Sequence, residues 1–198
     1  MSIAVTERPA AASFGYAEYC RLPETERFEV IAGGKLPMAP APTAAHQIVS
    51  ANLFDILRAH ARTQGGLALA APLDVILDQH NIVQPDLLYL APERKSLLQA
   101  RGVFGAPDLI VEIVSPCSQH RDFVVKHRLY RRFGVSEYWI VNPGLETIDI
   151  LTLEDGAYAL HLEASTQTAE ATDRIATSKL LPSLRIPLET VFADIPKA

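Results

Sequence analysis

Two acidic residues lie in or beside short apolar runs, where a carboxylate is out of place. Asp86 directly precedes the run 87–90, and Glu112 lies inside the run 109–114. A buried ionised carboxylate without a partner is costly, so each acid needs a cation or a set of hydrogen-bond donors. If the two runs form neighbouring strands, both carboxylates can converge on one divalent cation, and the main-chain carbonyl of Ile113 offers a third oxygen.

This oxygen donor set suits magnesium or manganese. Mg²⁺ prefers hard oxygen ligands in octahedral geometry and keeps several waters, so two carboxylates and one carbonyl are sufficient on the protein side. The cation makes a water more acidic and neutralises charge on a phosphate, which together favour attack on phosphorus. The pattern therefore predicts metal-dependent hydrolysis of a phosphate ester.

A lysine and a third acid complete the predicted site. Lys126 lies four residues after Asp122 on a predicted helix, so the two share a helix face and can pair. Its ammonium group can orient the nucleophile or stabilise charge on the phosphate. Glu29, in the apolar run 28–32, can supply another ligand directly or through water. The candidate catalytic residues are Asp86, Glu112, Lys126 and Glu29, and the candidate metal ligands are Asp86, Glu112 and Ile113.

Each of these residues also has a purely structural explanation. Asp86 follows a proline and can be a strand-start residue, Glu112 can pair with an arginine, and a solvated ion pair is the commoner fate of a residue such as Lys126. Asp108 is an alternative ligand to Asp86, because positions 108, 110 and 112 share one face of a strand. Ser115 has little support as a hydrolase nucleophile, since no G-x-S-x-G motif surrounds it.

The run that contains Glu112 begins a predicted strand, helix, strand unit. Between residues 119 and 133, apolar residues recur at the i, i+4, i+8 spacing of an amphipathic helix, and Gly134 stands where that helix should end. Residues 138–141 indicate the second strand. Such a unit usually has parallel strands joined by a right-handed crossover.

The other predicted elements flank this unit. Before it, the sequence predicts a short helix over 14–20, a hairpin over 28–38 that turns at Gly33-Gly34, and a helix over 44–62 capped by Thr43. Two paired strands over 67–77 and 83–90, with a turn at 78–81, and a short helix or loop over 91–104 follow. After it, the sequence predicts a hairpin over 147–162 that turns at Asp155-Gly156 and a final strand and short helix over 178–192. We expect a loose tail over 1–13 and one domain over 14–198. The predicted fold class is α/β, with a mixed β-sheet flanked by helices.

Composition narrows the classes of function. The net charge is −5, from 18 basic and 23 acidic residues, which argues mildly against nucleic-acid binding through the overall field. Cys20 and Cys117 lie far apart without a metal-ligand spacing, so neither a disulfide framework nor a zinc site is expected. The chain has no signal-peptide pattern and no apolar run of about 18 residues. We therefore expect a cytoplasmic protein without a membrane partner.

The same residues carry a resemblance to a known family. The matching segments are 28–36 with its glycine turn, His46 at the start of the first long helix, 83–87, 107–116, Asp122, Lys126, Tyr130 and 134–141. In kind and order they resemble the Uma-two family of restriction-endonuclease-like proteins, a branch of the PD-(D/E)XK nuclease superfamily. The resemblance covers residues 16–141, and the combination is more specific than any single motif.

The resemblance implies a restriction-endonuclease-like fold with Asp86 and Glu112 as metal ligands. The usual superfamily lysine, two residues after the second acid, would fall at Val114 and is absent. The family instead takes this lysine from the following helix, which matches Lys126. Asn142 stands where many members have aspartate, and this difference does not touch the proposed site.

Two functions follow as hypotheses. The first is a magnesium- or manganese-dependent endonuclease that hydrolyses phosphodiester bonds of DNA. Basic helix residues near the site can contact backbone phosphates, namely Arg121, Lys126, Arg128, Arg131 and Arg132. For Arg131 and Arg132 a solvated helix face is the slightly better explanation, because no aromatic residues are interleaved with them. A homodimer is expected for this function, because each subunit can then cut one strand. The second is a catalytically idle nuclease-fold module that binds nucleic acid or protein, which the acidic net charge supports.

Overall fold

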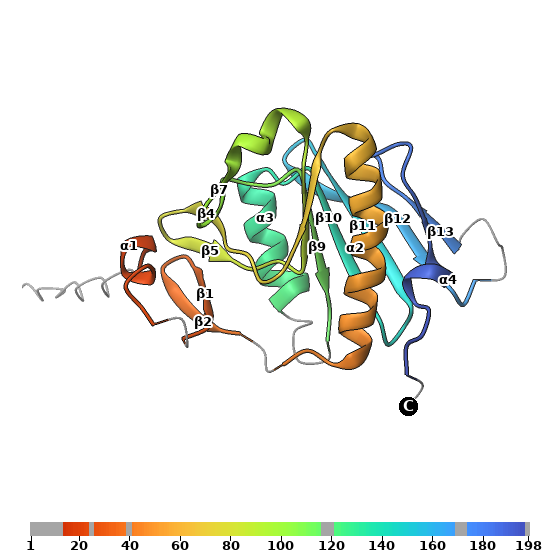
Figure 1. The fold of residues 1–198 in the computed structure, drawn as a ribbon, viewed down its shortest axis with the longest axis horizontal. Coiled ribbons are helices and arrows are strands. Elements are labelled where there is room, and N and C mark those ends of the chain that lie inside the picture. Colours follow the sequence, from red (N-terminus) through yellow and green to blue (C-terminus); the bar gives the residue numbers. More distant parts are fainter. Residues whose placement is uncertain (1–13, 24–25, 39–40, 116–120, 169–173, 197–198) are drawn as a thin grey trace, which may run out of the picture.

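The chain forms two six-stranded mixed sheets with helices packed against them (Figure 1). The computed structural model describes residues 14–23, 26–38, 41–115, 121–168 and 174–196. The predicted α/β class with a mixed sheet and flanking helices is confirmed. The predicted tail over 1–13, Cys117 and residues 119–120 of the predicted helix lie outside the described residues.

The main sheet contains the predicted strand, helix, strand unit at its centre. Its strands, in spatial order, are β12 (Ala157–Ser165), β11 (Thr147–Glu154), β10 (Glu137–Asn142), β9 (Leu109–Ile113), β6 (Leu87–Leu90) and β3 (Leu67–Ala70). β9 and β10 are parallel, as predicted, whereas every other neighbouring pair in this sheet is antiparallel. The parallel pair requires a crossover, and the helical segment between the two strands provides it.

Helices cover both faces of the main sheet. On one face, α2 (Ala44–Gln64) packs its buried residues against the odd-numbered residues of β9, and α4 (Leu188–Val191) joins the same apolar cluster. On the other face, α3 (His127–Phe133) packs with the even-numbered residues of β9 and with strands of the second sheet. This alternation follows from the two-residue period of a strand, and it places residue 112 on the α3 face.

The second sheet is formed largely by the N-terminal half of the chain. In spatial order it contains β2 (Gly34–Pro37), β1 (Phe28–Ile31), β5 (Asn81–Val83), β4 (Val75–Asp78), β8 (Gly102–Phe104) and β7 (Leu98–Gln99). β1, β2, β4 and β5 lie on the opposite side of the molecule from α4 and β13 (Ile175–Thr177) (Figure 1). This sheet was not predicted as a separate layer.

The antiparallel pairing predicted for 67–77 and 83–90 is confirmed, because β3 pairs with β6 and β4 with β5. The prediction of two continuous strands is wrong, because each is divided between the sheets. The chain leaves the main sheet after β3 and enters the second sheet at β4, and it returns between β5 and β6. Pro72 and Pro85 lie in these two crossing segments. A proline has no N–H to donate to a strand ladder, so pairing is interrupted there.

The local turn and cap signals are largely correct. Thr43 Oγ1 accepts a hydrogen bond from His46 N at 3.2 Å, which caps α2. Asp155 and Gly156 have φ values of 49° and 77° in the β11–β12 turn. The first hairpin turns one residue earlier than predicted, at Ala32 and Gly33, with φ values of 50° and 74°.

The remaining elements are short. They are α1 (Tyr16–Tyr19), the 3₁₀ helix η1 (Pro92–Leu97), the π-helical turn η2 (Arg121–Lys126) and β14 (Arg185–Pro187). β7 and β8 replace part of the helix or loop predicted over 91–104, and β14 and α4 form the predicted final strand and helix. In the part of the chain that the structure describes, no helix is long and apolar enough to span a lipid bilayer.

A buried carboxylate attaches the C-terminal segment to the main sheet. Glu137 is fully buried at the start of β10. Its Oε2 accepts hydrogen bonds from Trp139 Nε1 at 2.9 Å and Ser178 Oγ at 2.7 Å, and its Oε1 accepts one from Leu180 N at 2.6 Å. Neutral donors therefore satisfy both oxygens of this acid.

Replacing Glu137 with alanine should lower the free energy of unfolding by about 3 kcal/mol, because two buried donors and one partly buried donor lose their acceptor. Urea denaturation measures this change. The matched control is Glu154→Ala, whose carboxylate lies 2.6 Å from Lys179 Nζ in the same C-terminal segment but is exposed. Solvent screens that pair, so the control should leave stability nearly unchanged. Equal losses in the two variants would contradict this role of Glu137.

A second stability prediction concerns two acids that face each other on β11 and β12. Asp149 is opposite Glu163, and burial followed by the charge of Glu163 raises the pKa of Asp149. Because the folded state disfavours the ionised form, stability falls as pH rises from the ordinary aspartate pKa through the raised one. Asp149→Asn should therefore raise the melting temperature at pH 7, and the gain should disappear near pH 3. A gain of equal size at both pH values would contradict this explanation.

Candidate active site

Three charged side chains meet in the interior, where the two sheets approach each other. Lys126 Nζ lies 2.8 Å from Glu112 Oε1 and 2.9 Å from Glu29 Oε1. Glu29 comes from β1 of the second sheet, Glu112 from β9 of the main sheet, and Lys126 from the last position of η2. Their exposed fractions are 2%, 4% and 2%. The structure thus brings three of the four predicted catalytic residues into direct contact.

The helix that follows β9 positions two groups on Glu112. Lys126 ends η2 and Tyr130 lies four residues later on α3, so both project from the same side of a continuous helical segment. Tyr130 OH donates a hydrogen bond of 2.6 Å to Glu112 Oε1. Burial, followed by the negative charges of Glu112 and Glu29, raises the pKa of Tyr130 well above its usual value. Tyr130 therefore keeps its proton and remains a donor.

Glu29 has one satisfied and one unsatisfied oxygen. Its Oε1 accepts a hydrogen bond of 2.9 Å from the main-chain N–H of Gln84, in addition to the contact with Lys126. Its Oε2 is buried and has no hydrogen-bond partner among the described residues. A buried carboxylate oxygen without a donor is unfavourable, so this atom is a place where a cation or a water can bind.

Asp86 lies next to this cluster and is more exposed. The register of β6 against β9 pairs Leu87 with Val111, and one further step of that antiparallel register sets Asp86 opposite Glu112. Asp86 Oδ2 accepts a hydrogen bond of 2.7 Å from Ile113 N and lies 3.3 Å from His46 Nε2 on the first turn of α2. The side chain of Asp86 is 21% exposed, so it marks the side of the site nearest to solvent.

Comparison with known proteins identifies the family. A family model named Uma2 and described as "Putative restriction endonuclease" matches residues 16–189. The chain belongs to the Uma2 family. No functionally curated protein is detectably similar to it in sequence.

A solved structure supports the fold of this Uma2 protein. The crystal structure titled as that of "a putative nuclease belonging to DUF820 from Anabaena variabilis ATCC 29413" matches with a TM-score of 0.70. The match covers 89% of this chain and 96% of the other, at 16% sequence identity. Identity at that level supports a shared fold, and the family match supports a nuclease acting on nucleic acid.

The chemistry of the Uma2 site fits a hard divalent cation. Asp86, Glu112 and the Ile113 carbonyl offer only oxygen donors, which magnesium and manganese prefer. Two carboxylates, of Glu29 and Glu112, contact a single ammonium group, so this cluster has unbalanced negative charge. Within the described residues, no group of three or more His, Cys, Asp or Glu side chains is arranged to hold a metal ion. The predicted ligand set has only two carboxylates and relies on a main-chain carbonyl for the third oxygen.

One other predicted residue, Asp108, stands apart from the site. Asp108 lies at the opposite end of β9 from Glu112, where its Oδ2 accepts a hydrogen bond of 2.8 Å from Ala91 N and its Oδ1 lies 3.6 Å from Arg94 Nε. The structure therefore gives Asp108 a structural role instead of a place beside Asp86. The side chain of Asp122, predicted to pair with Lys126, lies outside what the structure describes.

Three contacts were not predicted from the sequence. Tyr130 was noted only as part of the family pattern, although its spacing of four from Lys126 was a usable signal. His46 and Gln84 gave no such signal, because their contacts with Asp86 and Glu29 join segments that are distant along the chain.

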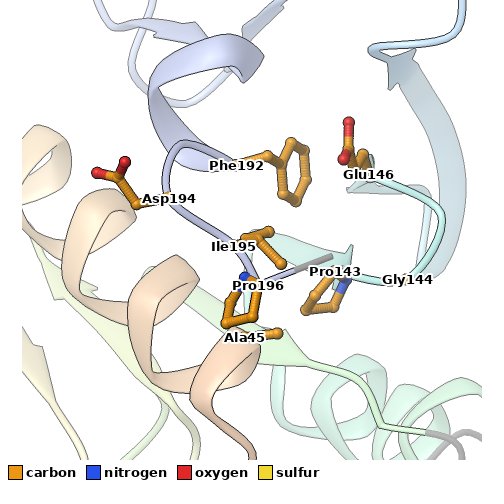
Figure 2. A pocket seen from close by; sticks show the side chains of 8 residues that line it. All are labelled: Ala45, Pro143, Gly144, Glu146, Phe192, Asp194, Ile195 and Pro196. Carbon is orange, nitrogen blue, oxygen red and sulfur yellow. The ribbon is translucent and has the colours of Figure 1, made fainter. Parts of the chain in front are cut away.

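A surface pocket of about 490 Å³ lies elsewhere in the fold. It is bounded by the start of α2, the β10–β11 turn and the segment after α4, and Figure 2 shows Phe192 and Ile195 beside Pro143 in this pocket. None of Glu29, Asp86, Glu112 or Lys126 lines it. We therefore do not assign this pocket to the active site.

The shared ammonium group makes a specific stability prediction. Lys126→Met should lower the free energy of unfolding at pH 7 by about 3 kcal/mol, because two buried carboxylates lose their common cation. Burial without that cation raises carboxylate pKa values in the folded variant, so its stability should recover as pH falls toward 5 and be lost as pH rises. Denaturant titrations at several pH values measure this.

The control for that experiment is Lys179→Met. Lys179 also contacts a glutamate, but its side chain is 56% exposed. This variant should stay close to wild type at every pH. A loss for Lys126→Met that does not change with pH, or no loss at all, would contradict the proposed charge balance.

Proposed function

We propose that this Uma2 protein is a divalent-metal-dependent endonuclease that hydrolyses phosphodiester bonds of DNA. The observation that carries the proposal is the buried contact of Lys126 with Glu112 and Glu29, beside the more exposed Asp86. Family membership supports the nuclease class. The arrangement of acids and lysine supports hydrolysis assisted by a cation.

Asp86, Glu112 and the Ile113 carbonyl are the proposed ligands of Mg²⁺ or Mn²⁺. When bound, the cation neutralises charge on a phosphate and makes a nearby water a better nucleophile. The main-chain N–H of Ile113 already fixes one oxygen of Asp86, and Tyr130 fixes one oxygen of Glu112. These hydrogen bonds orient both carboxylates before substrate arrives, which lowers the reorganisation that catalysis requires.

Lys126 is the proposed partner of the attacking water. Its ammonium group is almost fully buried, and electrostatic interactions are stronger where water is excluded. Glu29 holds this ammonium group from the side opposite to the main sheet, and the Gln84 N–H holds Glu29. Lys126 can then orient a water or stabilise the negative charge that develops on the phosphate, while Glu29 acts as a positioning residue.

The proposed substrate is DNA, bound in part by the basic side of α3. Arg128, Arg131 and Arg132 are exposed on the helix that contributes Tyr130. Cationic side chains at that place can contact backbone phosphates despite the net charge of −5, and such binding should weaken with salt. We also propose a homodimer, in which each subunit cuts one strand.

An idle nuclease-fold module that binds nucleic acid or protein is the alternative function. The acidic net charge favours it. Calorimetric titration with Mn²⁺ separates the two, because an active enzyme should show binding that Asp86→Asn abolishes. Absence of such binding in the wild type would favour the idle module.

Cleavage assays test the assignment of ligands. Asp86→Asn and Glu112→Gln should each reduce Mg²⁺-dependent cleavage of DNA by at least about 100-fold while the fold is kept. The matched control is Asp108→Asn, which removes the charge of an acid on the other end of β9 but keeps an oxygen for Ala91 N. It should retain activity within about threefold. Undiminished cleavage by Glu112→Gln in a clean preparation would reject the proposal.

A further inference from the structure

A second pocket lies beside the proposed active site, between α1 and the segments that contain Asp74 and Gln84. It has a volume of about 410 Å³, and the residues of interest in its lining are Tyr16, Tyr19, Arg27, Asp74, Gln84 and Arg101. Sites for small ligands usually range from about 300 to 1000 Å³, so a single nucleotide fits this volume. The proposed hydrolytic mechanism does not use this pocket.

The polar side of the pocket has one unsatisfied acceptor. Asp74 Oδ1 accepts hydrogen bonds from Gln84 Nε2 at 2.6 Å and from Tyr19 OH at 3.1 Å. Because Asp74 is an acceptor, it fixes the amide of Gln84 with Nε2 toward Asp74. The other amide atom, Gln84 Oε1, is buried and has no donor among the described residues. A ligand with an N–H group would complete this network.

The tyrosines of the pocket remain protonated. Burial, followed by the charge of Asp74, raises the pKa of Tyr19 to about 12. Burial and a hydrogen bond with Cys20 raise the pKa of Tyr16, and nearby Arg101 opposes that rise. Both rings are therefore neutral aromatic surfaces, which bind the faces or edges of planar bases without regard to sequence.

The rim of the pocket is basic. Arg27 and Arg101 are exposed, and neither has an ion-pair partner among the described residues. The acid on the same rim, Glu26, lies 4.0 Å from Lys35 Nζ. Two exposed guanidinium groups beside aromatic rings favour an anionic, aromatic ligand, because guanidinium groups bind phosphate oxygens with two parallel hydrogen bonds.

One residue connects this pocket to the active site. The side chain of Gln84 lines the pocket, and its main-chain N–H donates the 2.9 Å hydrogen bond to Glu29 Oε1. Glu29 in turn contacts Lys126. A ligand that contacts the Gln84 amide therefore acts two hydrogen bonds away from the proposed catalytic lysine.

We propose that this pocket receives one nucleotide of the nucleic-acid substrate. The base packs against Tyr16 and Tyr19 and donates an N–H to Gln84 Oε1. Its phosphate lies near Arg27 and Arg101. This inference rests on the proposed function, because the pocket would be a second contact for the strand that the active site cuts. The bound nucleotide would also hold Glu29 in place through Gln84. A base must leave its stack to enter such a pocket, so a duplex substrate has to be unpaired locally where it binds.

The test measures nucleotide binding without cleavage. The full-length protein, labelled with ¹⁵N and kept in EDTA, is titrated with adenosine 5′-monophosphate, and amide shifts are followed by NMR. The main-chain amides of Gln84 and Arg101 should shift in a saturable way. Ribose 5-phosphate, which has the phosphate but lacks the base, should bind at least about tenfold more weakly because it cannot donate to Gln84 Oε1.

Variants locate the binding site. Gln84→Met keeps the length of the side chain but removes its acceptor, and it should weaken binding by about tenfold. Arg101→Ala alters only an exposed side chain, so this variant still tests the nucleotide pocket if Gln84→Met does not fold. It should weaken nucleotide binding by about three- to tenfold. The charge-matched control is Arg62→Ala at the end of α2, outside the pocket lining, which should bind as wild type does.

The outcomes separate this inference from the proposed nuclease function. No saturable shift, equal binding of ribose 5-phosphate, or unchanged binding by Arg101→Ala would overturn the nucleotide pocket even if metal-dependent cleavage is found. Conversely, the pocket is supported if adenosine 5′-monophosphate binds more tightly than ribose 5-phosphate and if Gln84→Met and Arg101→Ala weaken its binding. That support holds even if Glu112→Gln retains cleavage and the proposed metal site is rejected.

Discussion

The ammonium group of Lys126 is the contact on which the rest of the site depends. It joins Glu112 of the main sheet to Glu29 of the second sheet at 2.8 and 2.9 Å. Burying two carboxylates at this depth is costly, and the shared ammonium group offsets part of that cost. Because the two acids come from different sheets, the same lysine also determines how the sheets meet at the site.

Such a cluster is better explained by chemistry than by stability. The desolvation of buried charges offsets much of their attraction, and apolar side chains in the same positions often stabilise a fold equally well. Here two carboxylates, of Glu29 and Glu112, share one ammonium group, and Glu29 Oε2 lacks a donor among the described residues. The excess of negative charge suits a cation, and a cation site is what we propose for this member of a nuclease family.

Local signals explain what could be predicted from the sequence. Glu112 was recognisable because an acid interrupts an apolar strand, and α2 was recognisable because Thr43 caps it and Gly65 ends it with φ of 73°. Local sequence patterns could not predict the contact between Glu29 and Lys126, because this contact depends on how the two sheets pack together. The division of the strands near Pro72 and Pro85 is a similar case: the prolines mark an interruption, but long-range packing decides which sheet each half joins. β7 and β8, of two and three residues, are too short to show any periodicity.

In the proposed site, Asp86 and Glu112 hold one divalent cation beside Lys126. The most direct measurement is a crystal structure grown with Mn²⁺, in which anomalous scattering locates the ion. We expect an anomalous peak between the two carboxylates, with the Ile113 carbonyl as a further ligand. A saturated crystal with no peak there, or with manganese bound only at other residues while Lys126 still bridges Glu112 and Glu29, would contradict it.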